Sequence, residues 1–184
     1  MKYLNFLSEI GKLKDVERTG WKIYKVRNPE SVADHSFRIA IMAMLYSKKL
    51  GLDENKCVKM SLVHDLEEVY TGDIATRADE KTQTVNNTGK EKIEKNAFDK
   101  LMKLLDDKEE IAELWQEYHE HKTLEAKLVN DLDKIEMVLQ ALDYKKGKRT
   151  KENLEEFFQT SGPRIITEKG KELWNRIRKE YLEL

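Results

Sequence analysis

Three well-separated segments of the sequence carry histidine and aspartate, the residue types that bind metal ions. His64 is followed directly by Asp65, His35 lies earlier among apolar residues, and Asp131 and Asp133 lie later within an apolar stripe. A buried carboxylate is costly unless it is paired or bound to a metal, and a shared divalent ion removes that cost. The pattern therefore predicts a metal site, with the choice between the two later aspartates open.

Two imidazoles and two carboxylates suit Co, Mn, Fe, Ni or Zn better than calcium. Four protein ligands in a six-coordinate shell leave two positions for water or substrate, as a catalytic site requires. A histidine on an apolar helix face is also often an ordinary core residue, so a structural role remains an alternative. His119 and His121 lie in the polar run EYHEHK at an expected helix end, where the helix dipole accounts for them.

The composition excludes several classes of protein. The 184 residues fit one domain, expected to span 1–184. Lys and Arg number 34 against 35 Asp and Glu, which predicts solvated helix faces and neither a nucleic-acid nor a membrane surface. Cys57 is the only cysteine, so no internal disulfide is possible. No signal peptide and no membrane-spanning stretch is recognisable, so we expect a cytoplasmic protein.

The elements that must position these side chains are predicted to be helices. Only two prolines and eight glycines occur, and strand-like alternation is scarce. Capping residues and apolar spacing place the helices at about 2–13, 31–50, 53–70, 89–104, 108–121, 123–145, around 154–158 and 167–184. Residues 14–30 are expected to form a connector and residues 74–89 an exposed, mobile loop. The fold class is therefore all-α, a single bundle of about seven or eight helices.

Five stretches together resemble one family. RTGW at 18–21, NPESVADHSFRIA at 28–40, LVHDLEEVYTGDI at 62–74, ELWQEYHEHKTLEAK at 113–127 and LVNDLDKIEMVLQA at 128–141 look like the HD-domain 5′-deoxynucleotidases. This family belongs to the HD-domain superfamily of metal-dependent phosphohydrolases. The resemblance spans about residues 3–160 and leaves the last helix, about 167–184, outside it.

The resemblance implies one divalent transition metal ion and release of phosphate from deoxynucleoside 5′-monophosphates. Its implied ligands are His35, His64, Asp65 and Asp133; Asp133 is preferred over Asp131 because the family's aspartate stands three residues before Glu-Met. Glu68 and Asp73 are the implied acid and base catalysts, in an order that the sequence leaves open. Because Glu68 follows His64 by four positions, we expect both on one helix face.

The resemblance also implies a substrate site and a homodimer. Trp21 corresponds to a tryptophan that orients the substrate, although a core plug is an equal alternative from the residue alone. Arg18 is expected to bind phosphate, and the stretch from Asp73 to Thr76 to contact substrate. The complete set of residues expected around a small-molecule nucleotide is Arg18, Trp21, His35, Asp65, Asp73, Thr76 and Asp133.

Two other functions compete with this one. The first is another HD-type phosphohydrolase, such as a phosphodiesterase or a nucleoside triphosphohydrolase. Dinuclear members of that kind need extra histidines, and only His119 and His121 are available, in polar surroundings. The second is a catalytically inert helical interaction module, which is disfavoured because all four implied ligands are present together with Glu68 and Asp73.

Overall fold

The structure is a computed structural model that describes residues 3–78 and 87–184. Over these residues the secondary structure is helical, and the only β-type pairing is an isolated bridge between Glu17 and Ser31. The prediction of an all-α fold is confirmed. None of the helices in the described part is long and apolar enough to cross a membrane.

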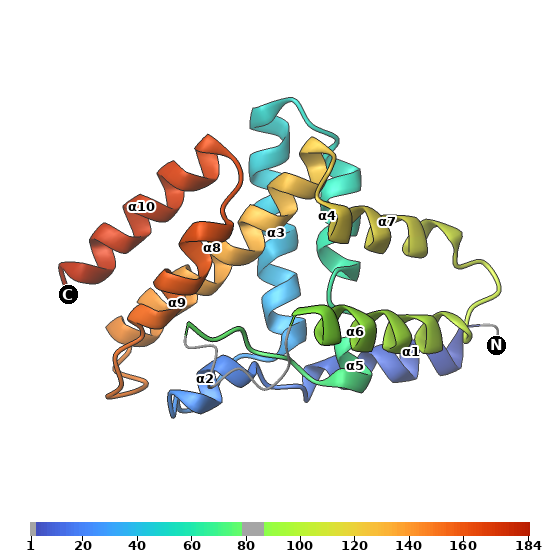
Figure 1. The fold of residues 1–184 in the computed structure, drawn as a ribbon, viewed down its shortest axis with the longest axis horizontal. Coiled ribbons are helices and arrows are strands. Elements are labelled where there is room, and N and C mark those ends of the chain that lie inside the picture. The colour runs from blue at the N-terminus through green and yellow to red at the C-terminus, as the bar shows by residue number, and fades with distance from the viewer. Residues whose placement is uncertain (1–2, 79–86) are drawn as a thin grey trace.

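The helices follow one another with short connections (Figure 1). Their bounds are α1 Leu4–Ile10, α2 Thr19–Ile23, α3 Val32–Leu50, α4 Glu54–Val63, α5 Glu68–Thr71, α6 Asn87–Met102, α7 Glu109–Glu120, α8 Leu124–Lys146, α9 Glu155–Ser161 and α10 Glu168–Leu182, with 3-10 turns η1 at Gly11–Lys14 and η3 at Gly162–Arg164. The two ends of the chain lie at opposite ends of the long axis of the molecule.

The long helices α3 and α8 organise the bundle. Ser31 and Asp34 form a complete capping box at the start of α3, and Gly51 ends it with a φ of 69°, a left-handed conformation that glycine tolerates. Thr123 caps α8 by accepting a hydrogen bond from Ala126 N–H. Helix α8 packs against α3, α4, α7, α9 and α10, so it touches nearly every layer of the fold.

One connected hydrophobic core runs from Phe6 near the start of the chain to Tyr181 near its end. On α8, the apolar residues Leu132 and Ile135 are almost completely buried. The same helix also buries charged side chains at Asp131, Asp133 and Glu136. Ionised groups at such positions need partners. Helix α8 therefore contributes both to the hydrophobic core and to a buried polar cluster.

Two predictions about the elements were wrong in detail. The expected single helix over 53–70 is divided into α4 and α5 by a tighter turn at residues 64–67, where Glu68 N–H bonds to Asp65 C=O at 3.2 Å. Glu67 in this turn reaches Trp115 Nε1 of α7 at 2.7 Å, and such a tertiary contact competes with a regular helix. His64 and Glu68 consequently belong to different helical segments and do not share one regular face.

The connectors also differ from expectation. The predicted connector 14–30 contains α2, and α6 begins at Asn87, earlier than the expected start near residue 89. Half of the predicted mobile loop, residues 79–86, lies outside the described residues. Its first part, residues 74–78, has no helical structure, and most of its side chains are half-buried.

Candidate metal and substrate site

Three parts of the fold bring the four predicted metal ligands together. His35 comes from α3, His64 and Asp65 from the turn after α4, and Asp133 from α8. His35 Nε2 lies 3.2 Å from Asp133 Oδ1, and His64 Nε2 lies 3.1 Å from Asp65 Oδ2. The two imidazole rings are 5.7 Å apart between centroids. Four residues that lie far apart in the sequence therefore form one cluster in the structure.

The imidazoles are oriented as metal ligands are. His35 Nδ1 contacts the Glu136 carboxylate, and His64 Nδ1 lies 2.9 Å from the Ser61 carbonyl oxygen. A partner on Nδ1 directs the lone pair of Nε2 to the other side of the ring. Both Nε2 atoms are buried and, among the residues that the structure describes, have no hydrogen-bond partner. One donor atom from each of His35, His64 and Asp65 lies within 4.8 Å of the others, so the residues fit a transition metal ion.

Charges around the cluster support the same conclusion. The cluster lies against a cavity of about 220 Å³, which Asp65 and Asp133 help to line. Among the described residues that line this cavity, seven are Asp or Glu and five are Lys or Arg. Acidic side chains therefore outnumber basic ones in the wall of the cavity. Burial alone would raise the pKa of Asp65, but His64 and the Arg18 guanidinium lower it below its usual range.

Glu136 is a site residue that sequence reasoning missed. It is completely buried on α8, contacts His35 Nδ1, and accepts a hydrogen bond from Arg38 Nε at 2.7 Å. Arg38 also binds Gln140 and Asp143, which lie one and two turns further along α8. Because Glu136 lies three residues after Asp133, the spacing of the two acids along α8 was a usable signal.

The two late aspartates, Asp131 and Asp133, have different contacts. Asp131 accepts hydrogen bonds from Ile166 N–H at 2.7 Å, Thr167 N–H at 2.8 Å and the Thr167 hydroxyl at 2.6 Å. It therefore holds the start of α10 and does not face the cavity. Asp133 instead lines the cavity and accepts a hydrogen bond from the Tyr118 hydroxyl at 2.8 Å.

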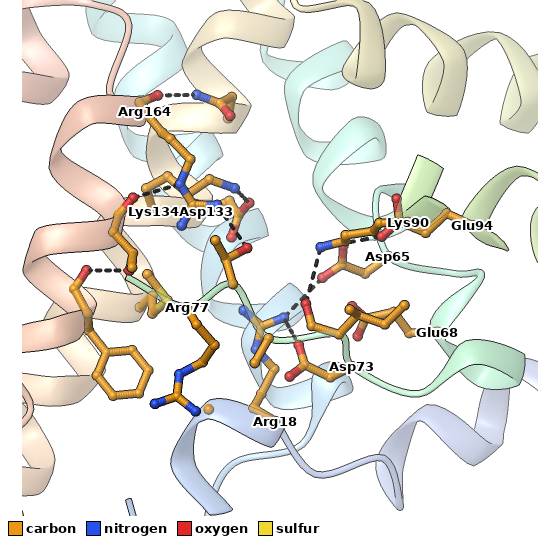
Figure 2. A pocket seen from close by; sticks show the side chains of 18 of the residues that line it. Arg18, Asp65, Glu68, Asp73, Arg77, Lys90, Glu94, Asp133, Lys134 and Arg164 are labelled. Carbon is orange, nitrogen blue, oxygen red and sulfur yellow. Dashed lines mark hydrogen bonds and ion pairs between the residues drawn. The ribbon is translucent and has the colours of Figure 1, made fainter. Parts of the chain in front are cut away.

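One side of the cavity is mainly acidic and the other mainly basic. Figure 2 shows Asp65, Glu68, Asp73 and Glu94 on one side together with Lys90, and Arg77, Lys134 and Arg164 on the other together with Asp133. The acidic side comes from α6 and from the segment between α4 and the 74–78 stretch, whereas Lys134 belongs to α8 and Arg164 to η3. Burial lowers the pKa of Lys134 although Asp133 is its ion-pair partner. The basic side suits an anionic ligand.

Glu68 and Asp73, the predicted catalysts, have different surroundings. Glu68 is 5% exposed and its Oε2 atom is buried without a hydrogen-bond partner. Burial, followed by the charges of Asp65 and Asp73, raises its pKa well above the usual range. Asp73 Oδ2 accepts a hydrogen bond from Thr19 N–H at 2.6 Å, and its Oδ1 lies 2.9 Å from Arg18 Nη1. Glu68 is therefore suited to carrying a proton, whereas Asp73 fixes the start of α2.

The predicted substrate contacts lie around the same cavity. Arg18 bridges Asp73 and Asp65, with 3.4 Å between Nη1 and Asp65 Oδ2 (Figure 2). Trp21 is 1% exposed, stacks on Phe157 with centroids 4.0 Å apart, and donates from Nε1 to Glu30 at 2.8 Å. This packing matches the core-plug alternative, while the tryptophan also lines the cavity.

The stretch after α5 is held over the cavity by α9. Glu156 accepts hydrogen bonds from Arg77 Nε at 3.1 Å and from Ala78 N–H at 2.7 Å, and it also binds the Tyr24 hydroxyl. Thr76 in this stretch lies 3.4 Å from Arg164 Nη1. Glu156 and Arg164 were not predicted, because they lie in or beyond the last part of the resemblance.

From the sequence, His119 and His121 were accounted for by the dipole of a helix end. Helix α7 does end there, with His121 as its C-cap, but both histidines also line the cavity, and burial lowers the pKa of each. His119 Nδ1 lies 2.9 Å from the Trp115 carbonyl oxygen, so its Nε2 is directed away from its own helix. One donor atom each of Glu67, Glu94 and His119 lies within 4.8 Å of the others, in a second group of possible metal ligands. Tyr118 of the run EYHEHK lines the cavity as well.

Known proteins resemble this chain in sequence. The family profile described as HD domain matches residues 10–174. The 5′-deoxynucleotidase HDDC2 of Xenopus laevis is 40% identical over 160 residues, which cover 86% of this chain and 77% of the relative.

Solved structures share the fold. A protein from Pyrococcus horikoshii is 31% identical with a TM-score of 0.76, covering 96% of this chain and 99% of that chain. A protein from Magnetospirillum magnetotacticum, titled a predicted metal-dependent phosphohydrolase, is 25% identical with a TM-score of 0.71, covering 99% of this chain and 92% of that chain.

Proposed function

The chain belongs to the HD-domain family, and from that premise we propose that it is a 5′-deoxynucleotidase, which hydrolyses deoxynucleoside 5′-monophosphates to deoxynucleosides and phosphate. The enzyme is a metal-dependent hydrolase. One observation carries the assignment of the centre. Two buried imidazole nitrogens without hydrogen-bond partners meet two carboxylates, those of Asp65 and Asp133, beside a cavity with cationic side chains.

We propose that His35, His64, Asp65 and Asp133 hold one divalent ion, which is Co, Mn, Fe, Ni or Zn. When bound, such an ion polarises a phosphate oxygen and lowers the pKa of coordinated water. Glu136 acts on this centre through His35, because its contact with Nδ1 fixes the ring and keeps Nε2 directed at the ion.

Glu68 is the proposed proton carrier. Among the described residues one oxygen of its buried carboxylate has no hydrogen-bond partner, and its pKa is raised well above the usual range, as suits a carboxyl group that exchanges a proton. It takes the proton of the attacking water, and the same proton is then available for the leaving 5′ oxygen. Asp73 has both oxygens occupied by Thr19 and Arg18, so its proposed role is to position Arg18 and the substrate sugar.

The remaining contacts define where the nucleotide lies. Arg18 binds the phosphate, because its guanidinium bridges Asp65 and Asp73 at the edge of the cavity. Trp21 and Thr76 contact the nucleoside portion, with Trp21 held rigid by Phe157 and Glu30. Of the proposed ligands, His35, Asp65 and Asp133 lie next to the phosphate.

We further propose that residues 1–184 form a single domain that acts in the cytoplasm as a homodimer on free nucleotides. Nearly equal numbers of acidic and basic residues support an enzyme of small molecules, not a protein that binds nucleic acid or membranes.

The test is phosphate release by metal-stripped protein that is resupplied with Co, Mn, Fe, Ni or Zn. Each ion is assayed on paired deoxy- and ribonucleoside 5′-monophosphates, with Asp65→Asn as the matched inactive variant. We expect metal-dependent release from the deoxy substrates that Asp65→Asn abolishes. Release only from cyclic or triphosphate nucleotides would refute the monophosphatase and favour the other HD-type hydrolases.

A further inference from the structure

Helix α3 carries an apolar stripe that the described residues, 3–78 and 87–184, leave exposed. Phe37, Ile41, Met44 and Leu45 are 66%, 42%, 46% and 57% exposed. At 100° per residue these four positions fall within about one third of the helix circumference. The buried residues of α3, including His35, Ile39 and Ala43, lie on the opposite side. An uncovered stripe of this kind on a helix at the centre of the fold indicates a contact surface.

The ends of the stripe carry opposite charges. Asp34 lies seven residues before Ile41 and Lys48 lies seven residues after it, and both are exposed. At a rise of about 1.5 Å per residue, each charge lies about 10 Å from Ile41. Asp34 uses Oδ2 in the capping box, whereas Lys48 forms no ion pair within residues 3–78 and 87–184. The stripe itself contains no charged residue between them.

From this arrangement we propose that the stripe binds the same stripe of a second copy of the chain, antiparallel, about a two-fold axis at Ile41. The inference rests on the homodimer proposed above and specifies its surface and register. In this pairing Ile41 meets Ile41 of the second copy, Phe37 meets Leu45, and Asp34 meets Lys48 twice. In a two-fold interface the two copies of the stripe run in opposite directions, so the stripe must be complementary to its own reversed sequence.

The spacing and the surroundings of the stripe suit helix packing. Positions 34, 37, 41, 44 and 48 repeat at intervals of three and four, the spacing at which two helices pack side by side at a small crossing angle. A surface groove borders the stripe between α3 and α8, lined by Phe37, Arg38, Ile41 and Gln140 among others. It can accept Met44 of the second copy, which lies opposite Arg38 in this register.

The stripe is the centre of the proposed interface and not all of it. Stable interfaces bury about 800 Å² on each partner, more than one helical stripe supplies. Helix α4 packs beside α3 and exposes a further apolar side chain, Leu62, at 51%. Since His35 is on the opposite side of α3, association does not require any rearrangement of the metal ligands.

The first experiment measures the mass of the holoenzyme by sedimentation equilibrium at micromolar concentration. Ile41→Glu places two like charges on the axis, and we expect at least a tenfold larger dissociation constant than for wild type. Ile93→Glu is the matched control, since Ile93 of α6 is also 42% exposed on a helix, and it should remain dimeric. Circular dichroism and metal content report whether each variant is folded.

The second experiment tests the register. Asp34→Lys and Lys48→Glu each place like charges at both ends, so each should dissociate alone, while an equimolar mixture should form a one-to-one heterodimer. Ile41→Cys should cross-link two chains on oxidation, and Ile93→Cys should not. The native thiol does not interfere, because Cys57 is completely buried and burial raises its pKa to about 12.

The outcomes separate the proposals. A wild-type monomer would overturn both the homodimer and this surface, and so would a monomer whose stripe binds lipid vesicles. A wild-type dimer that survives Ile41→Glu would overturn the surface alone, and a mixture without heterodimers would overturn the register. None of these results bears on phosphate release, which is measured separately.

Discussion

Replacing each of the two buried aspartates of α8 by asparagine should have opposite consequences. Asp131 and Asp133 are two residues apart on the same helix and both are buried, so the pair controls for local environment. In Asp131→Asn, an amide N–H₂ group replaces one carboxylate oxygen and faces the backbone N–H of Ile166 or Thr167. A lost charge-assisted hydrogen bond and a facing pair of donors together cost about 3 kcal/mol.

For a protein of this length, that loss lowers the melting temperature by about 5–10 °C. Asp131→Asn should nevertheless keep its metal and, below its melting temperature, its turnover. Asp133→Asn should lose metal and at least about 100-fold in activity. It should be the more stable of the two as metal-free protein, because the asparagine oxygen still accepts the hydrogen bond from Tyr118.

The assay combines thermal unfolding by circular dichroism on metal-free protein, metal content after reconstitution, and phosphate release. The reasoning is refuted if Asp131→Asn loses metal at an unchanged melting temperature, or if Asp133→Asn retains metal. Either result would mean that the contacts of the two carboxylates have been assigned to the wrong residue.

Three further predictions concern groups near the centre. Glu136→Gln removes the anionic partner of His35 and should weaken metal binding by about 10- to 100-fold in a chelator competition, whereas unchanged affinity would exclude its orienting role. Burial, and then the charge of Glu136, raises the pKa of Glu30 from 4.5 to about 7. The folded state therefore binds more protons than the unfolded state between these pH values, and the stabilisation present below about pH 4.5 is lost as the pH rises to 7. In urea titrations the free energy of unfolding of the wild type should therefore fall by about 3 kcal/mol relative to that of Glu30→Gln between pH 4.5 and 7. The same pH dependence in both proteins would contradict a raised pKa of Glu30. Glu156→Gln weakens the hold on Arg77 and should raise KM several-fold with a smaller change in kcat, and an equal fall in both kcat and kcat/KM would assign Glu156 to the chemical step instead.

Local rules predicted the starts of the major helices well. Ser31 with Asp34, Asp53 and Thr123 each cap the helix that their side chains indicate, because capping is decided by neighbours a few residues away. The division between α4 and α5 was not predictable in this way. No Gly or Pro occurs at residues 64–67, and the turn depends on a contact from Glu67 to α7.

The clustering of the four proposed metal ligands was predictable because a family pattern relates residues that lie far apart in the sequence. The remainder of the cavity depends on tertiary placement. Lys134 stood inside a recognised motif without any sign of which way it pointed, whereas the spacing of Glu136 from Asp133 was a usable signal. The place of His119 at the cavity was not predicted, since the polarity of its neighbours is the same for a solvated face and for a polar cavity.

The use of α8 as the common support for the centre has a consequence for biosynthesis. His35, His64 and Asp65 leave the ribosome well before Asp133, and the buried partner of His35, Glu136, follows still later. A nascent chain therefore carries three potential ligands without the helix that fixes them, and domains generally complete their folding as units. Metal acquisition is accordingly expected to follow translation of α8, and chains truncated before residue 133 should be released without a bound ion.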